Sequence, residues 1–222
     1  MWVSRHDDSG RTKQGDVLRI SLRDGEIDPL SAGESPNGIA MANGRVWVID
    51  FVDDTLRALE PRSGEVAVGP IDLGGALVAA ASYRGHIVIL DAGRSQVLWV
   101  DATSGKTVHR TSLDGSLGGL AVADDTIWVT DHGNRRLVRI DATTGEVIKT
   151  ITLPGMPGRV AATDRSVWVT DYWGGRLIRL STRTSRVEDQ IYVGGHPLEV
   201  TVGTEVVWVV NDGTIQRVDV LR

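Results

Sequence analysis

The most regular feature of the sequence is an apolar triplet that returns after every 40 to 45 residues. It reads MWV, VWV or IWV and is centred on Trp2, Trp47, Trp128, Trp168 and Trp208, with Val88 of IVIL in the remaining place. The intervals between these six anchors are 45, 41, 40, 40 and 40 residues. A fixed period of this length indicates a repeat protein in which each repeat is one supersecondary unit.

Each repeat contains further apolar segments that predict four short strands. A second segment follows each anchor, as in VLRIS, LVRID and IQRVD, and a turn such as Thr144-Gly145 leads to a third, as in EVIKTITL. A Gly/Pro loop precedes a fourth segment of small residues, such as GLAVA. Segments rich in Val, Ile, Thr and Trp between closely spaced turns are typical of β-strands. Four strands per repeat predict an all-β β-propeller, with the small-residue strands around its axis.

The first two strands of each repeat predict hairpins with a defined register. A turn centred on Gly133-Asn134, a pair that tolerates positive φ, places Trp128 opposite Arg139 and Asp131 opposite Arg136. The same construction pairs Trp168 with Arg179 (around Trp173-Gly174), Trp208 with Arg217 (around Asp212-Gly213), Trp2 with Arg19, Val88 with Trp99 and Trp47 with Ala58. A guanidinium stacked on an indole contributes about 0.5–2 kcal/mol. We therefore assign these Trp and Arg residues to the packing between blades.

Six anchors predict six blades in one domain over residues 1–222, with an incomplete first and last blade. If strands are labelled A to D from the axis outward, the chain begins at a B strand (Trp2) and stops after a C strand (Val218 to Val220). An unpaired inner edge exposes N–H and C=O groups to a partner strand. Three interpretations stay open: a six-bladed ring with two three-stranded blades, which we favour, a fragment of a longer chain, and a ring completed by a second copy.

The loops between B and C strands and those between D and A strands emerge on one face of a propeller, which therefore holds the candidate site. In DYWGGR, Tyr172 and Trp173 are predicted binding anchors, because exposed Tyr and Trp dominate many recognition surfaces. His132, His196 and Arg159 complete the predicted binding set. If the protein is an enzyme, His132, His196 and Glu199 are the candidate acid and base groups.

Acidic residues recur at one position of the B–C turns: Asp50, Asp91, Asp131 and Asp171, with Asn211 in the last repeat. As a ring of carboxylates they suit Mg²⁺ or Ca²⁺. As turn-starting residues they serve the structure, and this is the interpretation we favour. We expect no cofactor, with Mg²⁺ or Ca²⁺ as the alternative. The first B–C arm, SRHDDSGRTKQGD, is longer than the others and is expected to be solvated.

The composition of the chain limits the compartments and the classes of partner that we expect. The 222 residues are 41% hydrophobic and 24% charged, with a net charge of −5, which gives no basic footprint for nucleic acid. No membrane-spanning run and no signal peptide core appear, so we expect a soluble protein, either cytoplasmic or an exported domain of a longer one. The absence of Cys excludes disulfides and thiolate metal sites. No P-loop, GxSxG or dinucleotide fingerprint occurs.

The blade pattern VWVTD…RLVRIDATTGEVIKTITLPGMPGRVAAT resembles the streptogramin lyase-like (virginiamycin B lyase-like) propellers and their YVTN and NHL relatives over essentially the whole chain. The calcium-dependent lactonase propellers are similar in fold. For the lyases, the resemblance implies a Mg²⁺-dependent elimination that opens a cyclic depsipeptide. Those enzymes carry PH in more than one D–A loop, with a nearby Glu. This chain has one such loop, GGHPLEV, with the order reversed to His196-Pro197.

Together these observations favour a non-catalytic binding or sensing propeller, as a whole protein or as a domain of a larger one. Its partner would be a protein, peptide or small molecule on the loop face. The alternatives are a metal-dependent lyase or hydrolase of the streptogramin lyase-like type, and an assembly module completed by another chain.

Overall fold

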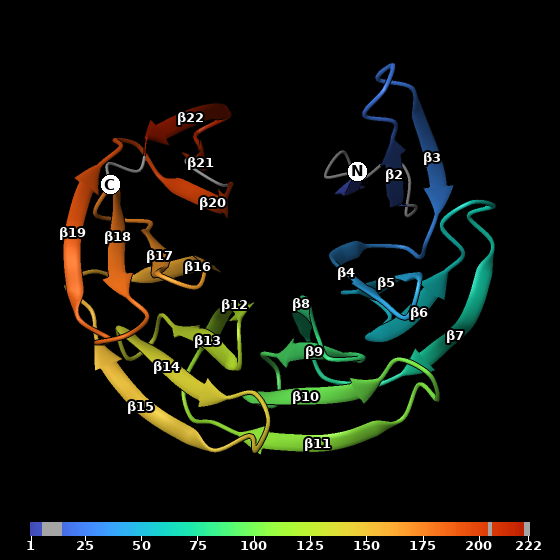
Figure 1. Cartoon of the computed structure of the whole chain (residues 1–222), viewed down its shortest axis with the longest axis horizontal. Coiled ribbons are helices and arrows are strands. Elements are labelled where there is room, and N and C mark those ends of the chain that lie inside the picture. The colour runs from blue at the N-terminus through green and yellow to red at the C-terminus, as the bar shows by residue number, and fades with distance from the viewer. Residues whose placement is uncertain (6–14, 204–205, 220–222) are drawn as a thin grey trace. The chain divides into compact units, whose positions relative to one another are not determined.

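The chain forms six small antiparallel β-sheets. The computed structural model describes residues 1–5, 15–203 and 206–219, and all 22 elements within them are strands (Figure 1). Four sheets have four strands, while the first and the last have three, as the sequence predicts. No helix in these residues is long and apolar enough to span a membrane. Most of the arm SRHDDSGRTKQGD, at residues 6–14, and Val220 lie outside the described part of the chain.

The first compact unit, Met1–Leu113, contains three sheets. Their strands are β1 (Trp2–Arg5), β2 (Asp16–Ile20) and β3 (Ile27–Ser31); β4 (Pro36–Ala42), β5 (Arg45–Asp50), β6 (Thr55–Leu59) and β7 (Val66–Asp72); and β8 (Leu77–Tyr83), β9 (His86–Asp91), β10 (Gln96–Asp101) and β11 (Thr107–Ser112). Each strand pairs with its neighbour in sequence, so every sheet is a meander.

The second compact unit begins at Asp114 and also contains three sheets. Their strands are β12 (Leu117–Ala123), β13 (Thr126–Asp131), β14 (Arg136–Asp141) and β15 (Val147–Thr152); β16 (Pro157–Ala162), β17 (Ser166–Asp171), β18 (Arg176–Ser181) and β19 (Val187–Tyr192); and β20 (Pro197–Val202), β21 (Val206–Asn211) and β22 (Thr214–Asp219). A single domain over residues 1–222 stays a prediction.

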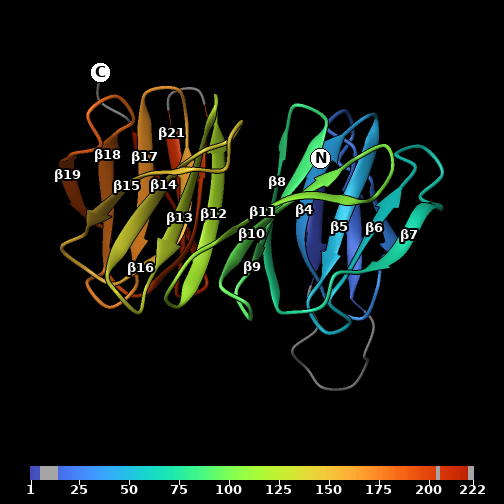
Figure 2. The same cartoon turned by 90° about the horizontal axis from the view of Figure 1, so that it is seen from below.

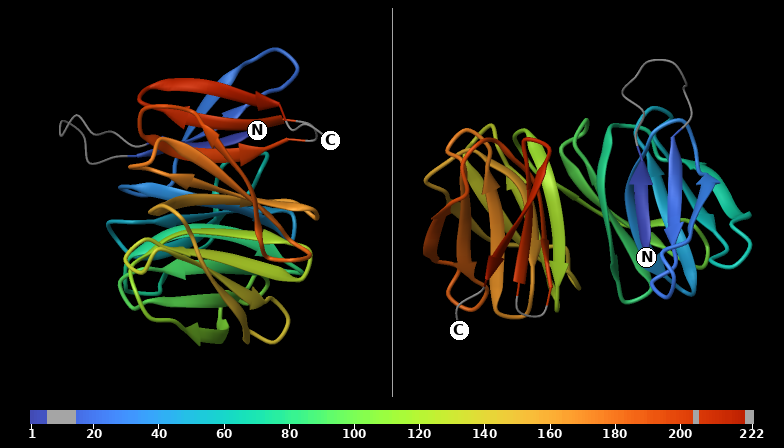
Figure 3. Two further views of the ribbon diagram at one scale, coloured as in Figure 1. Left: turned by 90° about the vertical axis from the view of Figure 1, so that its left-hand side faces the viewer. Right: turned by 90° about the horizontal axis from the view of Figure 1, so that it is seen from above.

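Within each unit, successive sheets pack face to face, as Figure 2 shows from one side and Figure 3 from two others. The apolar cores lie between these sheets. In the second unit, Trp128 packs with Val167 and Val169 of the next sheet, and Trp168 packs with Val207 and Val209 of the last one. Along β17, Val167 and Val169 are therefore buried against the preceding sheet, and Trp168 between them is buried against the following one.

The predicted hairpin register is confirmed in every repeat. The observed cross-strand pairs are Trp2 with Arg19, Trp47 with Ala58, Val88 with Trp99, Trp128 with Arg139, Trp168 with Arg179 and Trp208 with Arg217. The guanidinium of Arg139 lies 5.3 Å from the Trp128 ring centre, and that of Arg179 lies 5.5 Å from the Trp168 ring centre. Both distances fall within the range of a cation–π contact.

The turn geometry differs from the prediction in one respect. Residues 132–135 form a four-residue loop, and its positive φ falls at Arg135 (52°) rather than at Gly133-Asn134. The corresponding fourth loop residue also has positive φ in three other repeats, at Asp54, Ser95 and Gly175. One left-handed residue closes these loops, whereas the last hairpin has the two-residue turn Asp212-Gly213, with φ of 45° and 78°.

Trp208 on the last sheet is 40% exposed, whereas Trp47, Trp128 and Trp168 are at most 2% exposed. A following sheet covers each of those three, and Trp208 has no such cover within its own unit. The face around it contains a cavity of about 370 Å³, lined by Glu199, Val200, Thr201, Trp208, Val210 and Ile215. This sheet therefore presents apolar side chains at its surface.

Candidate functional site

The four recurrent aspartates act as loop clamps. Asp50, Asp91, Asp131 and Asp171 are at most 2% exposed. Each accepts a hydrogen bond of 2.9–3.1 Å from the backbone N–H located 15 residues earlier, in the loop that enters its own blade. Each also accepts a backbone N–H from the third residue after it. The carboxylates thus tie two loops together in every complete blade, which supports the structural interpretation.

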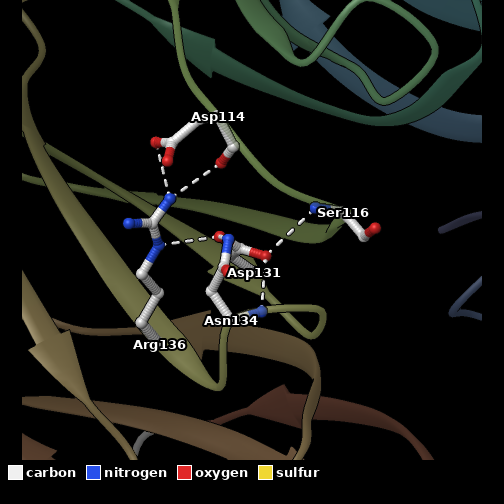
Figure 4. Close-up of polar contacts among 5 residues, drawn as sticks. All are labelled: Asp114, Ser116, Asp131, Asn134 and Arg136. Carbon is white, nitrogen blue, oxygen red and sulfur yellow. Dashed lines mark hydrogen bonds and ion pairs between the residues drawn. The ribbon is translucent and has the colours of Figure 1, made fainter.

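Asp131 shows the most complete clamp (Figure 4). Its carboxylate accepts bonds from the backbone N–H of Ser116, from the backbone and side chain of Asn134, and from Nε of Arg136 at 2.7 Å. Arg136 also binds the exposed Asp114 carboxylate at 2.6 Å. Burial alone would raise the pKa of Asp131, but the hydrogen bonds from Asn134, Arg136 and Ser116 outweigh burial and lower it.

The last blade breaks this pattern. Asn211 occupies the clamp position, and its amide donates to the carbonyls of Val193 (2.9 Å) and Gly194 (2.7 Å). Since the last hairpin has a two-residue turn, it lacks the loop N–H that donates to the carboxylate in the four complete blades. A neutral amide is therefore the better buried group here. The carboxylate appears one residue later, at Asp212.

Asp212 holds His196. Its Oδ2 accepts the backbone N–H of His196 at 3.1 Å, and its Oδ1 lies 3.2 Å from Nδ1 of the imidazole. The equivalent loop position carries Ser35, Ala76, Ser116 and Met156 in the other blades, so the histidine is also a departure from the repeat. Both side chains of the pair are about half exposed. Asp212 orients the ring and leaves Nε2 directed away from this contact.

Two aromatic side chains of the neighbouring blade pack against His196. The ring centre of Tyr172 lies 4.9 Å from that of His196 with an interplanar angle of 34°, and that of Trp173 lies 5.7 Å away at 88°. Tyr172 and Trp173 are themselves 4.8 Å apart and nearly perpendicular. Trp173 is nevertheless 69% exposed. We call Tyr172, Trp173, His196 and Asp212 the aromatic cluster.

Glycines allow the loops of the aromatic cluster to pack closely. Gly175 (φ 60°) accepts the N–H groups of Val193 and Gly194, which joins the two loops of the cluster. A side chain at Gly195 would collide with Asp212 and Asn211, since an added Cβ would lie 2.2 and 2.5 Å from their oxygens. Tyr192, 78% exposed, lies against Gly175. The indole of Trp173, 69% exposed, is the part of the cluster that a ligand can reach directly.

The remaining predicted site residues lie on the inner strands β16 (Arg159) and β20 (Glu199) and in the loop between β13 and β14 (His132). Arg159 donates from Nη1 to the carbonyl of Gly118 at 2.6 Å, and its Nε lies 3.6 Å from Oε2 of Glu199. His132 lies over Gly118, with Nδ1 3.2 Å from the position of an added Cβ. Burial raises the pKa of Glu199, although Arg159 opposes this rise. His132 and Arg159 thus both contact Gly118, whereas His196 packs with the aromatic pair.

The candidate metal ligands were compared with the arrangement that a metal site needs. Within residues 1–5, 15–203 and 206–219, no group of three or more His, Asp or Glu side chains is arranged to hold a metal ion. The predicted metal ligands Asp50, Asp91, Asp131 and Asp171 instead accept N–H groups. Their use as Mg²⁺ or Ca²⁺ ligands stays a hypothesis.

Sequence reasoning missed Asp212. It was assigned only to the last turn, because its role depends on a shorter hairpin that shifts the carboxylate by one residue. The signal was present in the repeat alignment: Asn211 replaces the clamp Asp at the same blade where His196 replaces a small or apolar residue. Two departures from the repeat in loops that contact each other indicate a function of the last blade that the other blades lack.

Comparison with known proteins gives a family and a fold. Residues 39–151, just over half of the chain, match the family model described as "Outer membrane protein assembly factor BamB". No curated protein matches the sequence.

Solved structures resemble the chain at low identity. A catalytically inactive virginiamycin B lyase from Staphylococcus aureus with quinupristin is 16% identical, with a TM-score of 0.79 over 93% of this chain and 74% of that one. A streptogramin B lyase is 18% identical, with a TM-score of 0.66 over 84% and 69%. The Neurospora crassa Pan2 WD40 domain is 12% identical, with a TM-score of 0.75 over 91% and 69%. These likenesses confirm the β-propeller fold and the resemblance to streptogramin lyase propellers at the level of fold.

Proposed function

The chain belongs to the β-propeller family described as outer membrane protein assembly factor BamB. We propose that it is a non-catalytic recognition propeller that binds its partner at the aromatic cluster. The observation that carries the proposal is the coincidence of two departures from the repeat, His196 and Asp212, in direct contact with the exposed Trp173. The other blades fold without these residues, so the fold does not require them.

The aromatic cluster has the composition of a binding anchor. Exposed Trp and Tyr supply large apolar area at low cost in side-chain entropy. The half-exposed Asp212 and the oriented imidazole of His196 add hydrogen-bonding groups at its edge. The arrangement suits a ligand that presents a flat apolar face beside a polar group, as peptides and glycans do.

A binding panel with matched variants tests the proposal. The wild-type protein is applied to arrayed peptides and glycans beside the Tyr172→Ala/Trp173→Ala variant. The control is Phe51→Ala/Val52→Ala, which removes two exposed apolar side chains from the same loop position of another blade. We expect ligands that bind the wild type and the control but lose about tenfold or more in affinity for the first variant. Equal binding by all three proteins, or no wild-type binding at all, contradicts the proposal.

A metal-dependent lyase or hydrolase is the second candidate function. The specific observation in its favour is the contact of Asp212 with Nδ1 of His196, which orients the imidazole, beside the pairing of Glu199 with Arg159 on the neighbouring strands. The oriented His196 adds a candidate base. Quinupristin, present in the similar lyase structure, is a suitable probe with Mg²⁺. This candidate predicts ring opening by the wild type that is lost in His196→Ala at unchanged melting temperature. An intact cyclic compound after prolonged incubation contradicts it.

Assembly is the third candidate, favoured by the exposed face around Trp208. In three other blades the equivalent Trp is covered by the following sheet, so a blade of a second copy would be a chemically suitable cover. Light-scattering mass measurements over a range of concentrations test this candidate. Self-association that Trp208→Gln abolishes would support it, whereas a monomeric mass throughout would eliminate it.

A further inference from the structure

Arg159 has a guanidinium that is only partly used. Its Nη1 donates to the Gly118 carbonyl, which holds the side chain across the neighbouring inner strand. Its Nε lies 3.6 Å from Glu199, too far for a hydrogen bond. In the described part of the chain, Nη2 donates to no protein group. The side chain is about one-third exposed, so an incoming group can reach these donors.

His132 lies in the loop between β13 and β14, and its ring contacts the same residue of β12 as Arg159 does. Its backbone N–H donates to Ser116, but among the described residues its imidazole makes no hydrogen bond. The ring lies over Gly118, the residue whose carbonyl anchors Arg159. An added Cβ at Gly118 would lie 3.2 Å from Nδ1 of His132, and the Gly118 carbonyl accepts from Nη1 of Arg159, so both side chains meet at this one residue of β12.

We propose that Arg159 and His132 form a site for an oxyanion, a carboxylate or phosphate group carried by a ligand, on the inner strands of the second unit. A guanidinium presents fixed donors that suit paired oxygens, and an imidazole adds a donor from another direction. The bond to the Gly118 carbonyl orients Arg159 before a ligand binds, which reduces the side-chain entropy lost on binding. This site is separate from the aromatic cluster and does not depend on it.

Glu199 competes with the bound anion. Its carboxylate lies beside the same guanidinium, and burial raises its pKa despite the nearby positive charge. An oxyanion at Arg159 would bring a second negative charge close to Glu199, and like charges at short range repel. Removing this carboxylate should therefore strengthen anion binding. A purely structural role of Arg159, as a strap between β12 and β16, gives no such result.

NMR titration with inorganic phosphate and, separately, with acetate tests the site. The His132 imidazole signals are assigned by comparison with His132→Ala. We expect saturable shifts at His132, binding weakened about tenfold or more in Arg159→Gln, and binding several-fold tighter in Glu199→Gln. The control is Arg165→Gln, which removes an exposed arginine paired only with its neighbour Asp164. Stronger binding of one anion identifies the group as a carboxylate or a phosphate.

Three outcomes overturn the proposal. They are the absence of saturable shifts at His132 with either anion, equal affinities of the wild type and Arg159→Gln, and unchanged affinity in Glu199→Gln. Because the last variant leaves Arg159 and its bond to Gly118 in place, it keeps the test informative if Arg159→Gln does not fold.

Discussion

At the scale of single residues, the clamp aspartates show how one buried carboxylate fixes two loops. Asp131 gathers donors from Ser116, Asn134 and Arg136, which lie in different loops or strands of one blade. A buried charge is tolerated only when donors of this number and quality surround it. The last hairpin has a shorter turn without these donors, and Asn211 stands there in place of the aspartate.

Replacing Asp131 tests the clamp. Asp131→Asn should lower the free energy of unfolding by about 2–4 kcal/mol, because it leaves Arg136 and two N–H groups with a poorer acceptor. Denaturant unfolding at neutral pH measures the loss. The control Asp164→Asn, at a largely exposed side chain, should change stability by less than about 0.5 kcal/mol.

The same variant gives a pH dependence with a defined sign. The folded-state pKa of Asp131 is lowered, so its contribution to stability is fully present above the ordinary Asp pKa of about 3.9. It is lost as the pH falls through the lowered folded-state value. The stability difference between wild type and Asp131→Asn should therefore shrink on acidification below about pH 4. A difference that is constant down to pH 2 would contradict the clamp.

At the scale of elements, the hairpin register was predictable because three local signals agree. The alternation of apolar residues, the polar turn and the Trp–Arg spacing each select the same pairing, and a slip of one residue would turn Trp128 to the other face. The predicted position of the positive φ was wrong. Gly and Asn adopt positive φ readily, which favours Gly133-Asn134 in the sequence, but the four-residue loop has its positive φ at Arg135. Propensity identified the turn but not its backbone geometry.

The contact between Trp128 and Arg139 supports its hairpin at this scale. Arg139→Gln should reduce the free energy of unfolding by about 0.5–2 kcal/mol, because it removes the cation above the indole. A double-mutant cycle with Trp128→Leu isolates that contribution from the volume change. A coupling energy near zero would show that Arg139 acts only through Ser185, to which its Nη1 donates at 3.1 Å.

At the scale of the whole molecule, repeat counting predicted six sheets with incomplete first and last members. It also made Tyr172, Trp173 and His196 candidate binding residues, because they lie in B–C or D–A loops on one face and DYWGGR departs from a minimal turn. It did not predict their packing or the role of Asp212, since contacts between loops of neighbouring blades depend on side-chain directions that a period does not encode. Departures from a repeat locate candidate sites, and only the folded geometry shows which of them meet.

Metal independence is a prediction about the molecule as a whole. Because the clamp carboxylates accept protein N–H groups, millimolar Mg²⁺, Ca²⁺ or chelator should leave the melting temperature unchanged. An ion that binds the native state at one hundred times its dissociation constant adds about 2.7 kcal/mol, which thermal unfolding detects readily. A clear rise of the melting temperature with one ion would support the four aspartates as metal ligands.

The most direct test of the central claim is to replace His196 by the residue of two other blades, to neutralise Asp212, and to measure both stability and binding. In His196→Ser/Asp212→Asn, Ser is the residue found at this position in two other blades, and Asn-Gly favours the two-residue turn. We expect a melting temperature equal to or above that of the wild type, together with loss of binding to the ligands selected on the arrays. Retained binding, or a clear fall in melting temperature, would show that His196 and Asp212 serve the fold rather than recognition.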